Sequence, residues 1–316
     1  MDAEMVERIT RELRRELGVS DAAAPCPTIK GRGPADRPAP PPFSPENRSV
    51  FSPAKPGGPV CMEAGEDITS PQAKATPLLD RPQDPEALER MIRSTPARIG
   101  VGRAGPRLKT QTLLTLRSDH AAARDAVMMD VPQELLDQLG LFSVQTCCTS
   151  KDQYLTRPDL GRRFPPEVLE ELKRRCQPGP DVQIYASDGL SSTAVQANLA
   201  NILPVVTEGL KTRGLTVGTP FFVRFGRVAA MDHISEALDA KVTCVLLGER
   251  PGLGTAESMS AYLAYRATVN MPEARRTVVS NIHKNGISAV EAGAYLCDVI
   301  EAILKAKASG VELRKG

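Results

Sequence analysis

Two apolar runs, each followed by a polar turn that contains glycine, constrain the fold of this chain most strongly. The runs are Pro220–Phe225 and Lys241–Leu247. Apolar segments of this length, rich in Val, Leu and Phe, are typical of strands that are buried on both faces. The turns Gly226–Val228 and Gly248–Gly252 would then lie at the carboxyl ends of two strands, where ligands bind in an open α/β sheet.

Strand-like and helix-like segments alternate through the C-terminal half of the chain. The predicted strands and helices are Asp181–Ala186, Thr193–Arg213, Thr219–Arg224, Asp232–Leu238, Val242–Leu247, Ser260–Tyr265, Thr277–Ile282 and Ser288–Lys307. This alternation predicts an α/β fold with a mostly parallel, Rossmann-like sheet that helices cover on both faces. We assign this domain to residues 141–316, preceded by a small helical domain at residues 84–140.

The beginning of the chain has a different character. Apolar residues recur there at intervals of four, at Met5, Ile9, Leu13 and Leu17. With charged residues between them, this spacing predicts an amphipathic helix within residues 1–20. Residues 21–83 are crowded with Pro, Ala, Gly and Ser and have no apolar period, which predicts a disordered linker. A helix on such a linker suits docking to a partner, although it could instead pack back on the folded body.

The composition excludes several classes of protein. A formal net charge of +2 over 316 residues, with no Trp, gives no basis for nucleic-acid binding. No run approaches the roughly 18 apolar residues of a membrane span, and no apolar signal segment is visible at the start. The seven cysteines are scattered without a C-x-x-C pair, as expected for reduced thiols in a cytoplasmic protein.

The motifs of a self-contained enzyme are missing from the sequence. The chain has three histidines, far apart, and no G-x-S-x-G, phosphate-binding loop or H-E-x-x-H motif. We therefore predict neither catalytic residues nor metal ligands. Polar turns at the predicted strand ends offer amide, carboxylate and guanidinium groups, at Ser187–Gly189, Gly226–Val228, Gly248–Arg250 and Ser280–His283. Such a rim suits a large ligand with many amide groups, although ordinary turns would have the same composition.

A G-x-G-x-x-G pattern occurs at Gly100–Gly105. A dinucleotide-binding loop needs a strand before this pattern and a helix after it. Only a short segment precedes it, and Pro106 follows it directly. We therefore predict a tight loop that presents Arg103 and Arg107, and a stand-alone Rossmann-type oxidoreductase remains an alternative function.

Several of these segments resemble one known family, the small (light) subunits of adenosylcobalamin-dependent ethanolamine ammonia-lyase. They follow the order of the family from about Arg93 to Gly310. The matching stretches are Gly102–Arg107, Tyr154–Asp159, Gly161–Arg163, Ser187–Ser191, Gly218–Arg224, Gly226–Val228, Gly248–Gly254, Glu257–Ser258 and Ser280–His283.

The resemblance implies a subunit of a heteromeric carbon–nitrogen lyase that is not active alone. In this family the large subunit is a TIM barrel that binds ethanolamine and carries the catalytic residues. Cobalamin lies between the subunits, and homolytic Co–C cleavage starts a radical deamination to acetaldehyde and ammonia. The resemblance places cofactor contacts at Val228, Glu249 and Val278. Family members can carry Cys where Val278 stands, so this contact would be through the backbone or van der Waals contact.

The resemblance also suggests a role for the predicted N-terminal helix. Short amphipathic helices on linkers are similar to the encapsulation peptides of bacterial microcompartment cargo. We therefore expect residues 1–18 to dock on shell or cargo proteins, and the protein to lie in the cytoplasm within a microcompartment. A non-catalytic cargo or adaptor protein is the further alternative.

Overall fold

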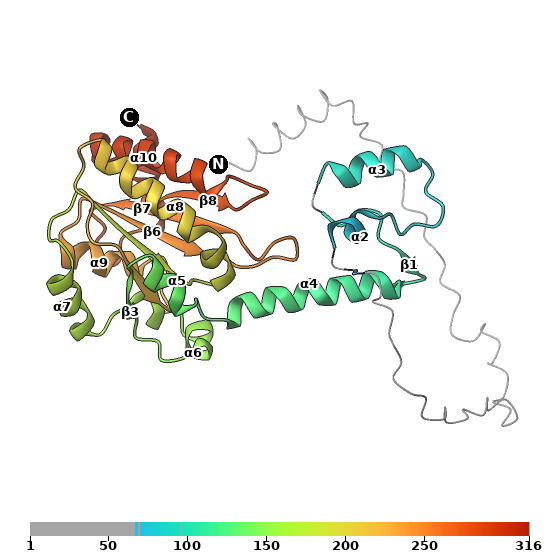
Figure 1. The fold of residues 1–316 in the computed structure, drawn as a ribbon, viewed down its shortest axis with the longest axis horizontal. Helices are drawn as coiled ribbons and strands as arrows, with labels where there is room; N and C mark the ends of the chain where they lie inside the picture. Colours follow the sequence, from blue (N-terminus) through green and yellow to red (C-terminus); the bar gives the residue numbers. More distant parts are fainter. Residues whose placement is uncertain (1–66, 69, 96, 316) are drawn as a thin grey trace, which may run out of the picture. The chain divides into compact units, whose positions relative to one another are not determined.

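The computed structural model describes residues 67–68, 70–95 and 97–315 (Figure 1). These residues belong to one compact unit, Ala64–Gly316. The predicted helix in residues 1–20 and the first part of the predicted linker lie outside the described residues. Within the described part of the chain, no helix combines the length and apolar character needed to cross a membrane.

A six-stranded sheet forms the centre of the α/β part. Its spatial order is β3 (Phe142–Gln145), β5 (Phe221–Arg224), β4 (Val182–Ser187), β6 (Val242–Gly248), β7 (Met259–Tyr265) and β8 (Thr277–Ile282). The pairs β3–β5, β5–β4 and β4–β6 are parallel, whereas β6–β7 and β7–β8 are antiparallel.

The predicted α/β class is confirmed, but the mostly parallel, Rossmann-like sheet is not, because the sheet is mixed. The reason lies in the connections. A parallel neighbour requires a crossover of a dozen or more residues, usually through a helix. The segment between β6 and β7 covers residues 249–258 and contains no helix, so the chain returns as an antiparallel partner. Between β7 and β8 there is only the short 3₁₀ turn η4 (Glu273–Arg275).

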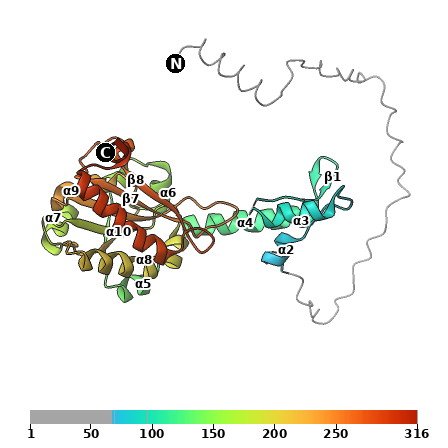
Figure 2. The same cartoon turned by 90° about the horizontal axis from the view of Figure 1, so that it is seen from above.

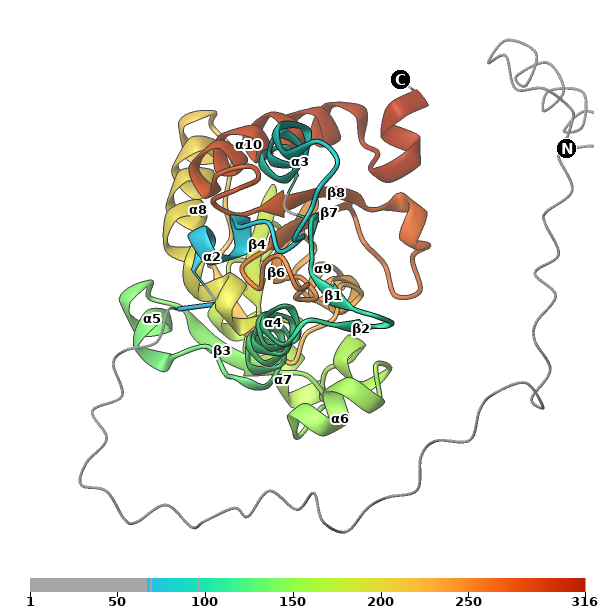
Figure 3. The same ribbon diagram turned by 90° about the vertical axis from the view of Figure 1, so that its right-hand side faces the viewer.

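Two apolar layers hold the helices to the two faces of the sheet. Alternate residues of one strand enter opposite layers, as Ile184 and Tyr185 of β4 do. The first layer includes α8 (Ser192–Thr212) and α10 (Ala289–Ala306). The second includes α7 (Pro166–Arg175) and α9 (Ala230–Leu238). Figures 1 and 3 show these two pairs of helices on opposite sides of the sheet, and Figure 2 shows the molecule from the side of α10.

Local signals in the sequence set several helix ends. Ser191 accepts a hydrogen bond from the Ala194 amide and so caps the start of α8. At the start of α10, Ser288 and Glu291 form a reciprocal capping box, as their spacing predicts. These caps fix where the chain leaves the sheet, and therefore fix the turns that precede the helices.

The residues before the sheet form α2 (Pro71–Ala75), α3 (Pro85–Arg93), α4 (Thr110–Met128) and α5 (Gln133–Gln138). The presence of α2 corrects the prediction of a disordered linker as far as residue 83. Ser70 caps α2 and Pro71 occupies its first turn, where proline is favourable. The Leu78 amide also donates to the Gly100 carbonyl over 2.9 Å. Proline-rich composition concealed these local signals.

The glycine-rich stretch is a tight loop, as predicted. It forms a small antiparallel hairpin from β1 (Arg103–Ala104) and β2 (Arg107–Leu108). Gly105 in the turn has φ +62°, a conformation that glycine adopts without strain. Arg103 and Arg107 are exposed. No βαβ unit surrounds the stretch, so it has no context for dinucleotide binding.

Candidate functional site

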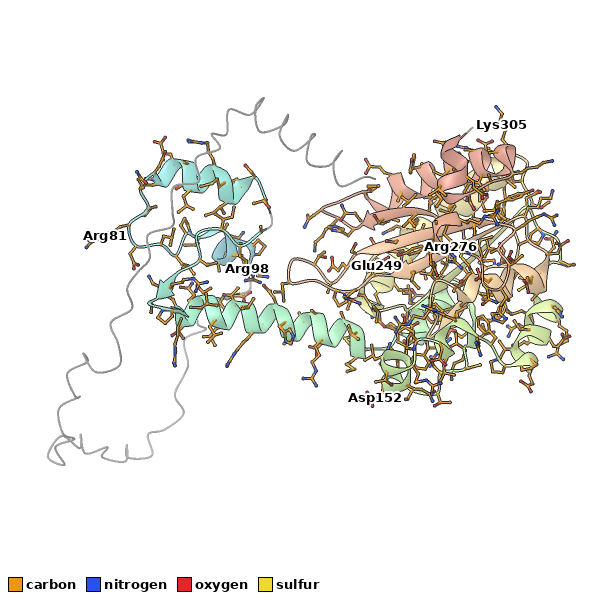
Figure 4. The ribbon with its side chains drawn as sticks, turned by 180° about the vertical axis from the view of Figure 1, so that it is seen from behind. Arg81, Arg98, Asp152, Glu249, Arg276 and Lys305 are labelled. Carbon is orange, nitrogen blue, oxygen red and sulfur yellow. The ribbon has the colours of Figure 1, made fainter. Side chains whose placement is uncertain are left out.

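Three of the four polar turns predicted from the sequence lie side by side. They follow β5, β4 and β6, which are adjacent and parallel, so all three turns leave the same edge of the sheet. We call these turns, Phe225–Val228, Asp188–Ser191 and Glu249–Arg250, the rim. Figure 4 labels Glu249, which lies where the connection to β7 leaves the sheet.

The turn after β4 packs directly on the end of β6. The Leu190 amide donates to the Gly248 carbonyl over 2.9 Å. A Cβ atom on Gly248 would lie 2.1 Å from the Ser191 carbonyl oxygen and 2.5 Å from that of Asp188. Only glycine therefore permits this approach of two backbones. The contact fixes the position from which the next residue, Glu249, projects.

The turn after β5 depends on a buried carboxylate. Phe225 has φ +57°, a left-handed conformation that is unusual for a large side chain. Its amide donates over 2.9 Å to Oδ1 of Asp188, which is 3% exposed. Oδ2 lies 3.4 Å from Nζ of Lys151. Burial raises the pKa of Asp188, while Lys151 and the Ser187 hydroxyl oppose this rise.

Arg227 and Tyr154 stabilise the turn after β5 through hydrogen bonds and a cation–π contact. The guanidinium carbon of Arg227 lies 4.1 Å from the centre of the Tyr154 ring, and its Nη2 donates to the Tyr154 carbonyl over 2.7 Å. The Tyr154 hydroxyl donates to the Gly226 carbonyl over 3.2 Å. Burial raises the pKa of Tyr154, so this hydroxyl remains a donor. Tyr154 belongs to α6 (Lys151–Thr156), which therefore supports the rim.

The three residues that the resemblance assigned to cofactor contact lie on one face of the sheet. Val228 is half-buried and packs against the apolar layer that includes α9. Glu249 Oε1 accepts a hydrogen bond of 2.6 Å from the Tyr262 hydroxyl. Val278, which is 46% exposed, pairs directly with Tyr262 across β7 and β8. Tyr262 therefore contacts Glu249 and Val278 directly, and it packs against the same apolar layer as Val228.

The fourth predicted turn, Ser280–His283, overlaps the end of β8, which is separated from β6 by β7. Its His283 is 8% exposed, and Nε2 lies 2.8 Å from Oδ1 of Asn281. Asn281 has φ +64°, so this pair is part of a tight turn. Among the described residues, no group of three His, Cys, Asp or Glu side chains could hold a metal ion.

The sequence did not predict the supporting roles of Lys151, Tyr154 and Tyr262, although Tyr154 begins one of the stretches that match the family. Each of these residues contacts a residue elsewhere in the chain. Tyr262 lies 13 residues after Glu249, and Tyr154 lies 72 residues before Gly226. The alternation of β7 could have placed Tyr262 on one face, but the direction of β7 was needed to place it near Glu249.

The geometry defines an α/β protein with a rigid polar rim at the carboxyl edge of its parallel strands. Comparison with known proteins identifies the family. The family description "Ethanolamine ammonia-lyase light chain (EutC)" matches residues 85–314. The chain belongs to this family. The predicted role as a subunit of an ammonia-lyase is confirmed, and the oxidoreductase and adaptor alternatives are not favoured.

Individual relatives agree with this assignment. A Clostridium tetani protein named ethanolamine ammonia-lyase small subunit is 57% identical over 251 residues, which cover 78% of this chain and 84% of the relative. A protein of the same name from Clostridium acetobutylicum is 56% identical over 229 residues, covering 72% and 95% of the two chains. The Listeria monocytogenes protein of that name is 49% identical over 248 residues, covering 78% and 85%.

Proposed function

We propose that this subunit holds adenosylcobalamin against a catalytic large subunit during the radical deamination of ethanolamine to acetaldehyde and ammonia. The observation that carries the proposal is the common location of Val228, Glu249 and Val278 on one face of the sheet, at or near the rim. When bound, adenosylcobalamin supplies the radical chemistry. The chain itself offers no assembled acid–base or nucleophilic set among its described residues, so its part is to bind and to orient.

The residues present fit such a cofactor. A corrin ring has broad apolar faces and a periphery of amide side chains. Glu249 provides a carboxylate that accepts hydrogen bonds from amide N–H groups, and such charge-assisted bonds are stronger than neutral ones. The exposed Val278 and the half-buried Val228 provide apolar contact area. The backbone packing of Gly248 against the β4 turn holds this surface rigid before binding.

The large subunit would cover the opposite side of the cofactor and carry the substrate site. We propose that it is a TIM barrel, whose ligand sites lie at one end of the barrel. The cofactor would then be enclosed by two different chains, and neither chain would be active alone. The functional unit is accordingly a hetero-oligomer.

Replacing Glu249 by Ala tests the cofactor site. We expect the apparent Kd of the assembled enzyme for adenosylcobalamin to rise by about tenfold, because a charged hydrogen-bond acceptor is lost. The melting temperature of the isolated subunit should change little, since Glu249 lies in a turn outside the core. The measurement is a spectral titration of the enzyme reconstituted from both subunits. An unchanged Kd would remove Glu249 from the site.

We further propose that residues 1–18 direct the protein into a bacterial microcompartment in the cytoplasm. The support is the apolar stripe of Met5, Ile9, Leu13 and Leu17. Deletion of residues 1–20 should abolish co-purification with the shell and leave the activity of the reconstituted enzyme unchanged. Encapsulation of the shortened protein at the normal level would contradict this role.

A further inference from the structure

We propose that Tyr262 is a positioning residue of the cofactor site, which orients the Glu249 carboxylate to accept an amide N–H from the periphery of the cofactor. The inference rests on the proposed function, in which Glu249 faces cobalamin. It adds a residue that does not contact the cofactor itself and that acts through Glu249.

The register of the sheet brings the two side chains together. Tyr262 pairs with Val245 of β6 on one side and with Val278 of β8 on the other. The β6–β7 ladder continues past Gly248, because the Glu249 amide donates to the Ser258 carbonyl over 3.0 Å. Glu249 therefore extends the alternation of β6 and projects from the same face as Val245, the face on which Tyr262 lies.

The residue between them on this face of β7 is small. Ser260 pairs with Leu247, and it is fully buried. A larger side chain at this position would occupy the space between the Tyr262 ring and the end of β6. With serine there, the Tyr262 side chain can extend towards the end of β6, and its hydroxyl lies 2.6 Å from Oε1 of Glu249.

The chemistry of the pair leaves one carboxylate oxygen available. Burial, and then the hydrogen bond to Glu249, raise the pKa of Tyr262, so the phenol remains protonated and donates. Tyr262 is rigid because its ring packs in the apolar layer that includes α9. Oε1 is thereby fixed, and Oε2 has no hydrogen-bond or ion-pair partner among the residues that the structure describes. Oε2 is the atom that we expect to accept the amide N–H.

A purely structural role for Tyr262 makes a different prediction. If the Tyr262 hydroxyl contributes only to the stability of the fold, its removal should raise the Kd for adenosylcobalamin by the same factor whether Glu249 is present or absent. If it positions Glu249, its removal should matter only while Glu249 is present. A double-mutant cycle separates these two roles.

The experiment uses the enzyme reconstituted from both subunits and measures the Kd for adenosylcobalamin. Tyr262→Phe should raise this Kd by about fivefold, the loss expected for a hydrogen bond that acts through a second residue. Added to Glu249→Ala, it should cause no further rise. Tyr265→Phe is the matched control, because Tyr265 is on the same strand but packs against the layer on the opposite face. We expect it to leave the Kd unchanged.

Glu249→Asp provides a second test that leaves β7 intact, in case Tyr262→Phe impairs assembly. The shorter side chain draws the carboxylate away from the Tyr262 hydroxyl, so a similar rise in Kd is expected. The inference is overturned if Tyr262→Phe has no effect, or if it has the same effect with and without Glu249. If Glu249→Ala itself leaves the Kd unchanged, the proposed cofactor site fails, and the inference fails with it.

Discussion

Asp188→Ala should lower the free energy of unfolding by about 3 kcal/mol, because it leaves two buried groups without their partner. The Phe225 amide loses its acceptor, and Nζ of Lys151 loses its counter-ion in a place where the lysine side chain is 13% exposed. Of the two hydrogen bonds that hold the left-handed backbone of Phe225, only the one from the Thr146 hydroxyl to the Phe225 carbonyl, at 3.0 Å, then remains. Such a backbone conformation costs about 1–3 kcal/mol. We expect the turn to relax and to carry Arg227 and Val228 with it.

The functional consequence of Asp188→Ala should therefore exceed the structural one. The Kd of the reconstituted enzyme for adenosylcobalamin should rise more than tenfold, although Asp188 is too deeply buried to contact a ligand. Asp188→Asn keeps an oxygen for the Phe225 amide and loses only the charge, so it should retain most of the affinity. Chemical denaturation and cofactor titration of both variants check these expectations. An alanine variant with normal stability and normal affinity would contradict them.

The dependence of stability on pH gives an independent check on Asp188. Burial raises its pKa above the ordinary value of 3.8, so the folded state binds this proton more tightly than the unfolded state does. This group's contribution to stability is present below pH 3.8 and declines as pH rises through the raised pKa. The unfolding free energy of the wild type should therefore fall relative to that of Asp188→Asn as the pH increases. A difference that is constant with pH would contradict the raised pKa.

Much of the fold could be predicted from the sequence because local signals decide it. Buried strands such as β6 have no polar face, so their apolar runs mark them directly. Proline and capping residues mark the helices, as at Pro85–Arg93 and Ser288. The direction of β7 could not be predicted in this way. It follows from a connection of residues 249–258 that has no helical signal, and an apolar strand looks alike in either direction.

The same distinction between local signals and distant contacts applies to the residues of the candidate site. Glu249 and the turn after β5 could be predicted, because each directly follows an apolar run and so lies at a strand end. Tyr262 and Lys151 could not, since their roles depend on contacts across the sheet or between distant segments. The resemblance supplied Val278, whose place on an exposed edge strand has no local signature.

Gly248→Ala should disrupt the rim about as strongly as Asp188→Ala. Gly248 has no positive φ, so its backbone conformation suits alanine, and the whole effect must come from the added methyl group. That group would lie 2.1 Å from the Ser191 carbonyl oxygen and 2.5 Å from that of Asp188. Both are backbone atoms, so no side chain can rotate out of the way. The β4 turn and the end of β6 must separate, and the Leu190–Gly248 hydrogen bond of 2.9 Å is lost.

We expect Gly248→Ala to lower the free energy of unfolding by about 3 kcal/mol, at the upper end of the range for overpacking. It should also raise the Kd for adenosylcobalamin more than tenfold, because Glu249 is displaced from the Tyr262 hydroxyl. Gly254→Ala is the matched control. It lies in the same connection, and an added Cβ meets nothing within 4 Å. Measured by thermal unfolding and cofactor titration, the control should behave as wild type. If the two variants behave alike, the backbone contact between β4 and β6 does not set the geometry of the rim.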